Sequence, residues 1–274
     1  MEKAFYWYQK SAVNENSIAQ YNLGKCYQYG WGIERNKVKA FEWYEKSAKQ
    51  GDSDAQNRLG FFYEMGIGKV KDIKKAFYWY QTSAENQNTF AQYNLGNCYQ
   101  YGKGVKIDEV KAFKWYEKSA KQDYSEAQNW LGVFYENGIR IKKNIEKAFY
   151  WYQKSAENDN KFAQYNLGDF YQYGWEIEKN NIKAFEWYEK SAKQDYSDAQ
   201  NWLGIFYENG IGVEKNLKKA VYWYQKSAKD ENKFAQYNLG NCYQYGWGLK
   251  KMILKHLNGM KNPLNRVTVM HKIV

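Results

Sequence analysis

The stretch KAFEWYEKSAKQGDSDAQNRLGFFYEMGIG, residues 39–68, decides the fold. Small and aromatic residues in its first part recur at i, i+3, i+4, i+7 and i+8, which is one face of a helix. These residues are Ala40, Trp43, Tyr44, Ser47 and Ala48. Lysine and glutamate occupy most of the remaining positions, so the spacing predicts an amphipathic helix over residues 39–50.

The second part of the stretch, residues 54–68, repeats the same spacing at Ala55, Leu59, Phe62, Tyr63 and Gly66. Gly66 stands where a helix would end, because glycine accepts the left-handed conformation of a C-terminal cap. The two glycines of Gly-Ile-Gly then predict a tight turn. A helix-capping residue is expected just before the helix of residues 54–65 and before its equivalents in other repeats. The candidates are Asp52, Ser53 and Ser125. Together the two parts predict two antiparallel helices joined by short loops.

The pattern repeats along the chain with a fixed period. A Lys-Ala dipeptide recurs every 36 residues without an insertion; its alanines are Ala4, Ala40, Ala76, Ala112, Ala148, Ala184 and Ala220. A fixed period of this length predicts a solenoid of stacked helix pairs. Alternate units differ in composition, so two kinds of unit alternate with a period of 72 residues.

The helix of residues 54–65 and each of its equivalents contain a glycine directly after a leucine. These glycines are Gly24, Gly60, Gly96, Gly132, Gly168, Gly204 and Gly240. Glycine in a helix interior costs about 1 kcal/mol relative to alanine. Its recurrence therefore predicts a close contact with a neighbouring helix that an added methyl group would prevent.

At this point the residues resemble a known family. The pattern AQYNLGKCYQYGWG followed by KAFEWYEKSA is similar to the Sel1-like repeat, a relative of the tetratricopeptide repeat. The resemblance covers residues 1–248, about seven units with half units at both ends, and implies an all-α, right-handed α-solenoid of antiparallel helix pairs. One departure is Glu176, which stands where the second turn glycine is expected.

The pattern ends at residue 248, and residues 249–274 read LKKMILKHLNGMKNPLNRVTVMHKIV. Deleting one base from a plausible coding sequence for an eighth unit gives all 26 residues and a stop codon. We therefore interpret residues 249–274 as a frameshifted eighth unit; the alternative is a genuine divergent tail. Both histidines, His256 and His271, lie there and receive no functional weight. Because the array starts and stops within a repeat, we expect an excerpt of a longer protein or a trimmed gene model.

Composition limits the function classes. The net charge is +11, but residues 249–274 carry six Lys or Arg and no acidic residue, which leaves +5 over residues 1–248. No signal-peptide pattern or apolar run of membrane-spanning length is present. The three cysteines, Cys26, Cys98 and Cys242, occupy the same position in different units, and Phe170 fills that position once. They predict buried thiols and a reducing, cytoplasmic location.

No catalytic pattern stands out. Residues 1–248 contain no histidine, and the sequence has no HExxH, CxxC or phosphate-binding loop. The carboxylates are expected on solvated helix faces. We expect no enzyme activity, no cofactor and no metal.

RNA binding is the alternative function, since helical repeats can read RNA one base per unit and lysines alternate here with aromatic residues. The aromatic residues, however, have the spacing of a core, and a charge of +5 is no basic footprint. Binding to RNA would also weaken steeply with salt, whereas binding to an apolar peptide would not.

Protein binding is the favoured function, because solenoids present an extended concave surface. In related repeats the first helix of each pair lines this concave surface. The residues of the first helices that lie outside the core are therefore the candidate site. In one kind of unit these are Tyr21 and Asn22, Tyr93 and Asn94, Tyr165 and Asn166, and Tyr237 and Asn238; in the other they are Asn57 and Arg58, Asn129 and Trp130, and Asn201 and Trp202. Asparagine can bond a peptide backbone, and aromatic residues are common interface anchors.

An alternative for Trp130 and Trp202 is that they fill the interface between units. The family resemblance implies an adaptor or scaffold in signalling or protein quality control. It also implies a protein or peptide partner, such as a kinase or another signalling protein.

Overall fold

The computed structural model describes residues 1–246, which form two compact units, Met1–Ser155 and the described part of Ala156–Val274. The first unit contains α1 (Glu2–Val13), α2 (Ser17–Tyr29), α3 (Lys37–Lys49), α4 (Ser53–Met65), α5 (Ile73–Glu85), α6 (Thr89–Tyr101), α7 (Glu109–Ala120), α8 (Ser125–Asn137) and most of α9 (Ile145–Glu157). The second contains α10 (Lys161–Tyr173), α11 (Asn181–Lys193), α12 (Ser197–Asn209), α13 (Leu217–Lys229) and α14 (Lys233–Gln244).

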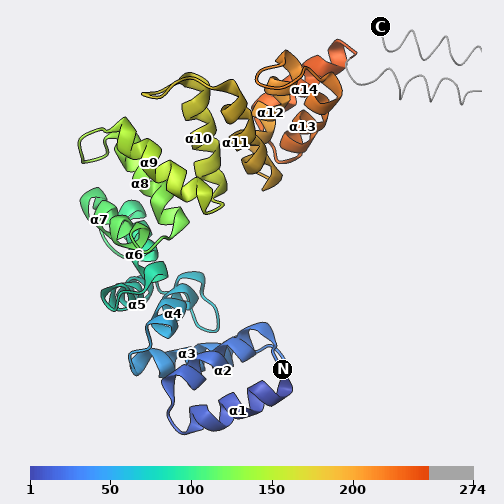
Figure 1. Cartoon of the computed structure of the whole chain (residues 1–274). Coiled ribbons are helices and arrows are strands. Elements are labelled where there is room, and N and C mark those ends of the chain that lie inside the picture. Colours follow the sequence, from blue (N-terminus) through green and yellow to red (C-terminus); the bar gives the residue numbers. More distant parts are fainter. Residues whose placement is uncertain (247–274) are drawn as a thin grey trace, which may run out of the picture. The chain divides into compact units, whose positions relative to one another are not determined.

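The predicted all-α fold of helix pairs is confirmed. Each 36-residue repeat consists of a first helix, such as α2, and a second helix, such as α3, packed against it. Consecutive helices run in opposite directions and stack within each unit as the helix pairs of a solenoid (Figure 1). No helix of residues 1–246 is long and apolar enough to cross a membrane. The predicted frameshift in residues 249–274, like the boundary at residue 248, lies outside the described residues and stays a prediction.

The helix ends follow local side-chain chemistry. Gly66 ends α4 in the predicted left-handed conformation, with φ = 67°. Asp52 caps the start of the same helix, because its Oδ1 accepts a hydrogen bond from the Ala55 backbone N–H at 2.7 Å. The predictions for Ser53 and Ser125 were wrong: both are the first helical residues, and Tyr124 stands at the cap of α8 without a side-chain cap bond.

The turn between the two helices of a repeat needs a second residue with positive φ. Gly32, Gly68, Gly104 and Gly212 supply it in four repeats, and Glu176 adopts the same conformation with φ = 53°. Arg140 also takes this role, with φ = 54°, a departure that the sequence comparison missed. The backbone geometry of the turn therefore persists where its glycine is lost.

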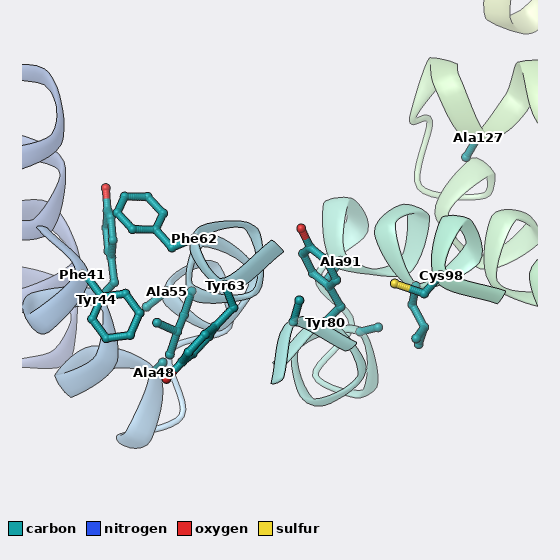
Figure 2. Packing of buried hydrophobic residues seen from close by; sticks show 14 of the residues in the cluster. Phe41, Tyr44, Ala48, Ala55, Phe62, Tyr63, Tyr80, Ala91, Cys98 and Ala127 are labelled. Atoms are coloured by element: carbon teal, nitrogen blue, oxygen red, sulfur yellow. The ribbon is translucent and has the colours of Figure 1, made fainter. Parts of the chain in front are cut away.

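The mid-helix glycines make the close contact that was predicted. A Cβ atom built on Gly24 would lie 2.7 Å from the ring of Tyr44, which is fully buried on the following helix. Gly60 and Tyr80 repeat this arrangement at the same distance. Figure 2 shows Tyr44 beside Phe62, with their ring centroids 5.2 Å apart. The glycine therefore accommodates the tyrosine ring that joins the two helices of each repeat.

Polar groups at the same interface fix its register. The hydroxyl of Tyr44 donates to Gln28 Oε1 at 2.6 Å, and Tyr80 donates to Glu64 at 2.8 Å. The Ser47 hydroxyl donates to the Ser17 carbonyl at 2.8 Å. Burial raises the pKa of these tyrosines, so they stay protonated and act as donors.

The buried cysteines confirm the predicted packing role. Cys26, Cys98 and Cys242 are free and almost fully buried, and Phe170 is buried in the same position. Burial raises the pKa of the Cys98 thiol to about 12, which makes it a poor nucleophile at neutral pH.

Candidate protein-binding face

The first helices of the repeats carry the fourteen predicted binding residues. In the first unit, four of these residues from α2, α4 and α6 come together around one pocket: Tyr21, Asn57, Arg58 and Asn94. Asp54, Phe61, Phe90 and Tyr124 complete its lining. We call this the Arg58 pocket; its volume is about 230 Å³.

Hydrogen bonds between successive repeats hold the polar wall of the Arg58 pocket. The Asn94 side-chain amide donates to Asn57 Oδ1 at 2.9 Å, and Asn88 donates to Asp54 Oδ1 at 2.7 Å. Burial raises the pKa of Tyr21, the negative charge of Asp54 adds to this rise, and the nearby Arg58 opposes it. The Tyr21 hydroxyl is therefore neutral at physiological pH.

Arg58 is the cationic group of the pocket. Its guanidinium carbon lies 5.9 Å from the ring centroid of Phe61 on the same helix. Within residues 1–246 it forms no ion pair shorter than 4.0 Å with a carboxylate. A guanidinium with planar donors at a pocket wall suits a carboxylate ligand.

Aromatic rings form the apolar wall. Phe90 contacts Tyr124 edge to face at 5.2 Å between ring centroids, and Tyr93 also contacts Tyr124 edge to face, at 5.1 Å. Sequence reasoning missed Phe61, Phe90 and Tyr124. One signal was available for Tyr124: a tyrosine stands there at a helix-capping position where the preceding repeats have Asp52 or Asn88.

Trp130 belongs to the interface between helices. Its ring stacks on the buried Tyr116 ring at 5.6 Å and 5°. This favours the alternative that Trp130 fills space between helices, although the residue is only half-buried. The neighbouring candidate Asn129 is half-buried.

The second unit has a different surface at the matching positions. Trp202 stacks on Tyr188 at 5.9 Å and 6°, and its indole N–H donates to the Tyr165 hydroxyl at 3.3 Å. Asn201 is buried and accepts a hydrogen bond from Asn238 at 3.0 Å. Asn201 is therefore part of the core, which contradicts its prediction as a residue outside it.

The remaining candidates are not among the residues that line the Arg58 pocket. Asn22 donates to the Ile18 carbonyl of its own helix at 2.9 Å. Asn166 is half-buried on α10, and Tyr237 on α14 is 70% exposed. The structure thus gathers four of the candidates and distributes the others along the helices.

A larger hollow of about 460 Å³ lies among α5, α6 and α7 and is lined by Trp115, Lys118 and Gln122 among others. Gln122 donates there to Gln92 Oε1 at 2.8 Å. The same glutamine pair recurs as Gln50 and Gln20 at 3.0 Å. The recurring bond identifies this region as a link between helices rather than a distinctive site.

Within the described part of the chain, no group of three or more His, Cys, Asp or Glu residues could hold a metal ion. The Arg58 pocket offers hydrogen-bonding groups, one arginine and aromatic rings.

Comparison with known families identifies the repeat. The Sel1 repeat family matches eight segments that together cover most of the chain: residues 1–12, 17–52, 53–88, 89–124, 125–160, 161–196, 197–232 and 233–251. The chain belongs to the Sel1 repeat family. In this Sel1 repeat protein, each full match contains one first helix and the second helix that packs on it, as in α2 and α3.

Solved structures agree with this assignment. The protective antigen c5321 of uropathogenic Escherichia coli, which displays an SLR fold, is 36% identical with a TM-score of 0.77; the match covers 88% of this chain and 52% of that chain. A Sel1 repeat protein from Oxalobacter formigenes is 32% identical with a TM-score of 0.74, covering 84% and 91%. This Sel1 repeat protein thus spans about half the length of the first relative. A search of curated proteins gave no match.

Proposed function

We propose that this Sel1 repeat protein is a non-enzymatic interaction scaffold that binds a partner peptide or helix along the first-helix face, with the Arg58 pocket as the principal contact. The observation that carries the proposal is the convergence of Tyr21, Asn57, Arg58 and Asn94 from three successive repeats. Helical repeat arrays bind partners through surfaces to which several repeats contribute.

The size of the Arg58 pocket favours a side chain as its occupant. Its volume of about 230 Å³ lies below the roughly 300–1,000 Å³ of small-molecule sites. Phe61, Phe90 and Tyr124 supply an apolar wall, and aromatic residues at such positions anchor protein interfaces. One apolar side chain of a partner is therefore the expected occupant.

The charge of the pocket specifies a neighbouring group on the partner. Arg58 presents the guanidinium, while Asp54 already accepts a hydrogen bond from Asn88. We infer that the bound segment carries an acidic residue beside its apolar anchor, because a bidentate contact with a carboxylate suits the guanidinium. The Asn57 and Asn94 amides would bond the partner's backbone.

Selection from a random peptide display library on the full chain tests this proposal. We expect the enriched peptides to combine an aromatic or aliphatic residue with an acidic one. Their affinity, measured by fluorescence anisotropy, should fall at least about tenfold in Arg58→Leu, the loss expected for one charge-assisted contact.

Asn137→Ala is the matched control. Asn137 is exposed on α8, and its side chain donates only to the Val133 carbonyl of its own helix at 3.0 Å. Peptide affinity should be the same in this variant as in the unaltered protein.

Two results would contradict the proposed site. Enriched peptides could bind Arg58→Leu with undiminished affinity, which would place binding elsewhere. A fluorescent oligouridine could instead bind more tightly than any peptide, with an affinity that drops steeply between low and moderate salt, as expected for RNA.

The cellular role belongs to the same proposal. We propose a cytoplasmic scaffold in signalling or protein quality control, with a kinase or another signalling protein as one class of partner. The free, buried thiols Cys26, Cys98 and Cys242 support a reducing location. Labelling of the protein in fractionated cells would test it, and recovery in a secreted fraction would contradict it.

A further inference from the structure

The positive charge of the first unit is concentrated in four segments of the chain. Each runs from the glycine that caps a first helix to the lysine before the core alanine of the second helix; the segments are residues 30–39, 66–75, 102–111 and 138–147. Together they contain 14 Lys or Arg and five Asp or Glu, a net charge of +9. The other residues of Met1–Ser155 contain 10 and 12, a net charge of −2. All 14 basic residues of the segments are exposed.

Contacts between repeats place these segments side by side. A Cβ atom built on Gly68 would lie 2.5 Å from the Lys37 carbonyl oxygen. One built on Gly104 would lie at the same distance from the carbonyl oxygen of the first residue of α5. Arg140 Nε donates to Glu109 at 2.9 Å. Each segment thus lies against the one before it, and the four form a continuous strip that we call the basic edge.

Several cations of the basic edge are available to a partner. Lys71, Lys106 and Lys143 are exposed and form no ion pair shorter than 4.0 Å within residues 1–246. Lys74 lies in the first turn of α5, where the dipole of the helix favours an acidic residue. These charges therefore do little to stabilise the repeats that carry them, which favours a role in binding.

Exposed aliphatic side chains lie among these lysines. Val70 stands between Lys69 and Lys71 and is 88% exposed. Ile107 follows Lys106 and is 65% exposed. Three further aliphatic residues of the basic edge are exposed: Ile33, Val38 and Val110. Such side chains gain free energy when a partner removes them from water.

We propose that the basic edge binds the surface of a membrane that contains anionic phospholipids. Its lysines contact the headgroups, and Val70 and Ile107 enter the boundary between headgroups and acyl chains. Clusters of basic residues are attracted to anionic headgroups, and apolar side chains beside them strengthen the binding. This contact goes beyond the proposed peptide binding and uses none of the residues that line the Arg58 pocket.

The aliphatic residues favour lipid over two other acidic partners. RNA gains little from Val70 and Ile107, because neither side chain has an aromatic face on which a base could stack. An acidic protein would need a matching cavity for each of these side chains, since they belong to separate turns. A fluid lipid surface accepts both without such a match.

Flotation of the full chain with lipid vesicles tests the proposal. We expect the chain to bind vesicles of phosphatidylcholine mixed with phosphatidylserine, and to remain unbound with phosphatidylcholine alone. Lys71→Ala/Lys106→Ala should weaken binding to the mixed vesicles about 25-fold, which is on the order of fivefold for each basic residue near an anionic surface. Val70→Ser should weaken it about tenfold, because serine gains nothing by leaving water.

Each variant has a matched control at the far end of a helix. Lys49→Ala/Lys121→Ala removes the same charge, but Lys49 is the last residue of α3 and Lys121 directly follows α7. Val13→Ser is the control for Val70→Ser, because Val13 is 67% exposed at the end of α1. Both controls should bind like the unaltered chain, since charges a helix length away are screened. All these variants change exposed residues, so their circular dichroism spectra should stay the same.

Four outcomes would overturn the proposal. The chain could bind both kinds of vesicle equally, or neither. The lysine control could lose as much binding as Lys71→Ala/Lys106→Ala, which would show a response to overall charge alone. Val70→Ser could bind with undiminished affinity, which would contradict the entry of aliphatic side chains. Oligouridine or polyglutamate could bind more tightly than the mixed vesicles, which would assign the basic edge to RNA or to an acidic protein.

Discussion

Two regions of the molecule carry different residues at one repeated position, Arg58 on α4 in the first unit and Trp202 on α12 in the second; Trp130 on α8 of the first unit matches Trp202. Arg58 lines a pocket of about 230 Å³ and forms no ion pair within the described residues. Trp202 stacks on Tyr188 and donates to Tyr165, so its ring occupies the space beside the buried tyrosine. The helices around both residues have the same lengths and pairings. At the same repeat position, the arginine lines a pocket whereas the tryptophan packs on a buried tyrosine.

The largest effect is expected from breaking the framework that both positions share. Tyr80→Ala and Tyr188→Ala should each lower the free energy of unfolding by about 3–5 kcal/mol, because each removes a buried ring and a hydrogen bond. Tyr188→Ala should cost more, since Trp202 also loses its stacking partner. Urea denaturation monitored by circular dichroism measures the free energy of unfolding of both variants. Equal losses would show that the stacking of Trp202 adds nothing.

A smaller effect is expected from the glycines beneath these rings. Gly60→Ala and Gly168→Ala should lower the free energy of unfolding by about 1–3 kcal/mol, because the new methyl group would overlap a tyrosine ring. Gly240→Ala would meet no atom of residues 1–246 within 4 Å and should raise the free energy of unfolding by up to about 1 kcal/mol. Thermal and urea unfolding would show whether each variant is less or more stable than the unaltered chain. Stabilisation by Gly60→Ala would contradict the packing described here.

Exchanging the two side chains sharpens the comparison directly. Trp202→Arg should lower the free energy of unfolding by about 1–2 kcal/mol through the lost stacking and hydrogen bond. Arg58→Trp should fill the Arg58 pocket and abolish binding of the selected peptides. Calorimetric titration with one such peptide would measure the second effect. Retained affinity in Arg58→Trp would separate peptide binding from this pocket.

The smallest effect concerns an ion pair that recurs in both units, Lys154 with Asp123 at 3.2 Å and Lys226 with Asp195 at 2.9 Å. The hydrogen bond and charge of Lys226 hold the pKa of Asp195 below its usual 3.8. Its contribution to stability is therefore present above pH 3.8 and is lost as the pH falls through the lowered folded value. Asp195→Asn should slightly lower the urea midpoint at pH 7 and leave it unchanged near pH 2.

The same small difference should disappear in 1 M salt, because exposed charges are screened. A midpoint difference between Asp195→Asn and the unaltered chain that survives both acid and salt would contradict an ionic origin.

Much of the fold could be predicted because it depends on local spacing. The period of 36, the helix faces and the close contact at Gly24 all follow from the order of residues. The turn at Arg140 escaped notice because a side chain with positive φ looks unlike the glycine it replaces. Ser53 was misplaced by one residue because Asp52 competes for the same capping position.

The candidate site was less predictable because it depends on contacts between repeats. Spacing placed Asn57 and Asn201 alike, but the structure leaves Asn57 at a pocket and buries Asn201. Phe90 and Tyr124 reach the pocket from later repeats, a relation that no single helix pattern contains. Side-chain direction and the identity of neighbours had to come from the packed helices.

The three buried cysteines are natural probes of local unfolding in three different repeats. Cys26, Cys98 and Cys242 lie on different helices, and a thiol-specific reagent can reach each one only when its own repeat opens. The rate of modification at each sulfur therefore reports how often that part of the array opens. Three rates from one native protein would show whether opening starts near Cys242 and spreads toward Cys98, without a single substitution.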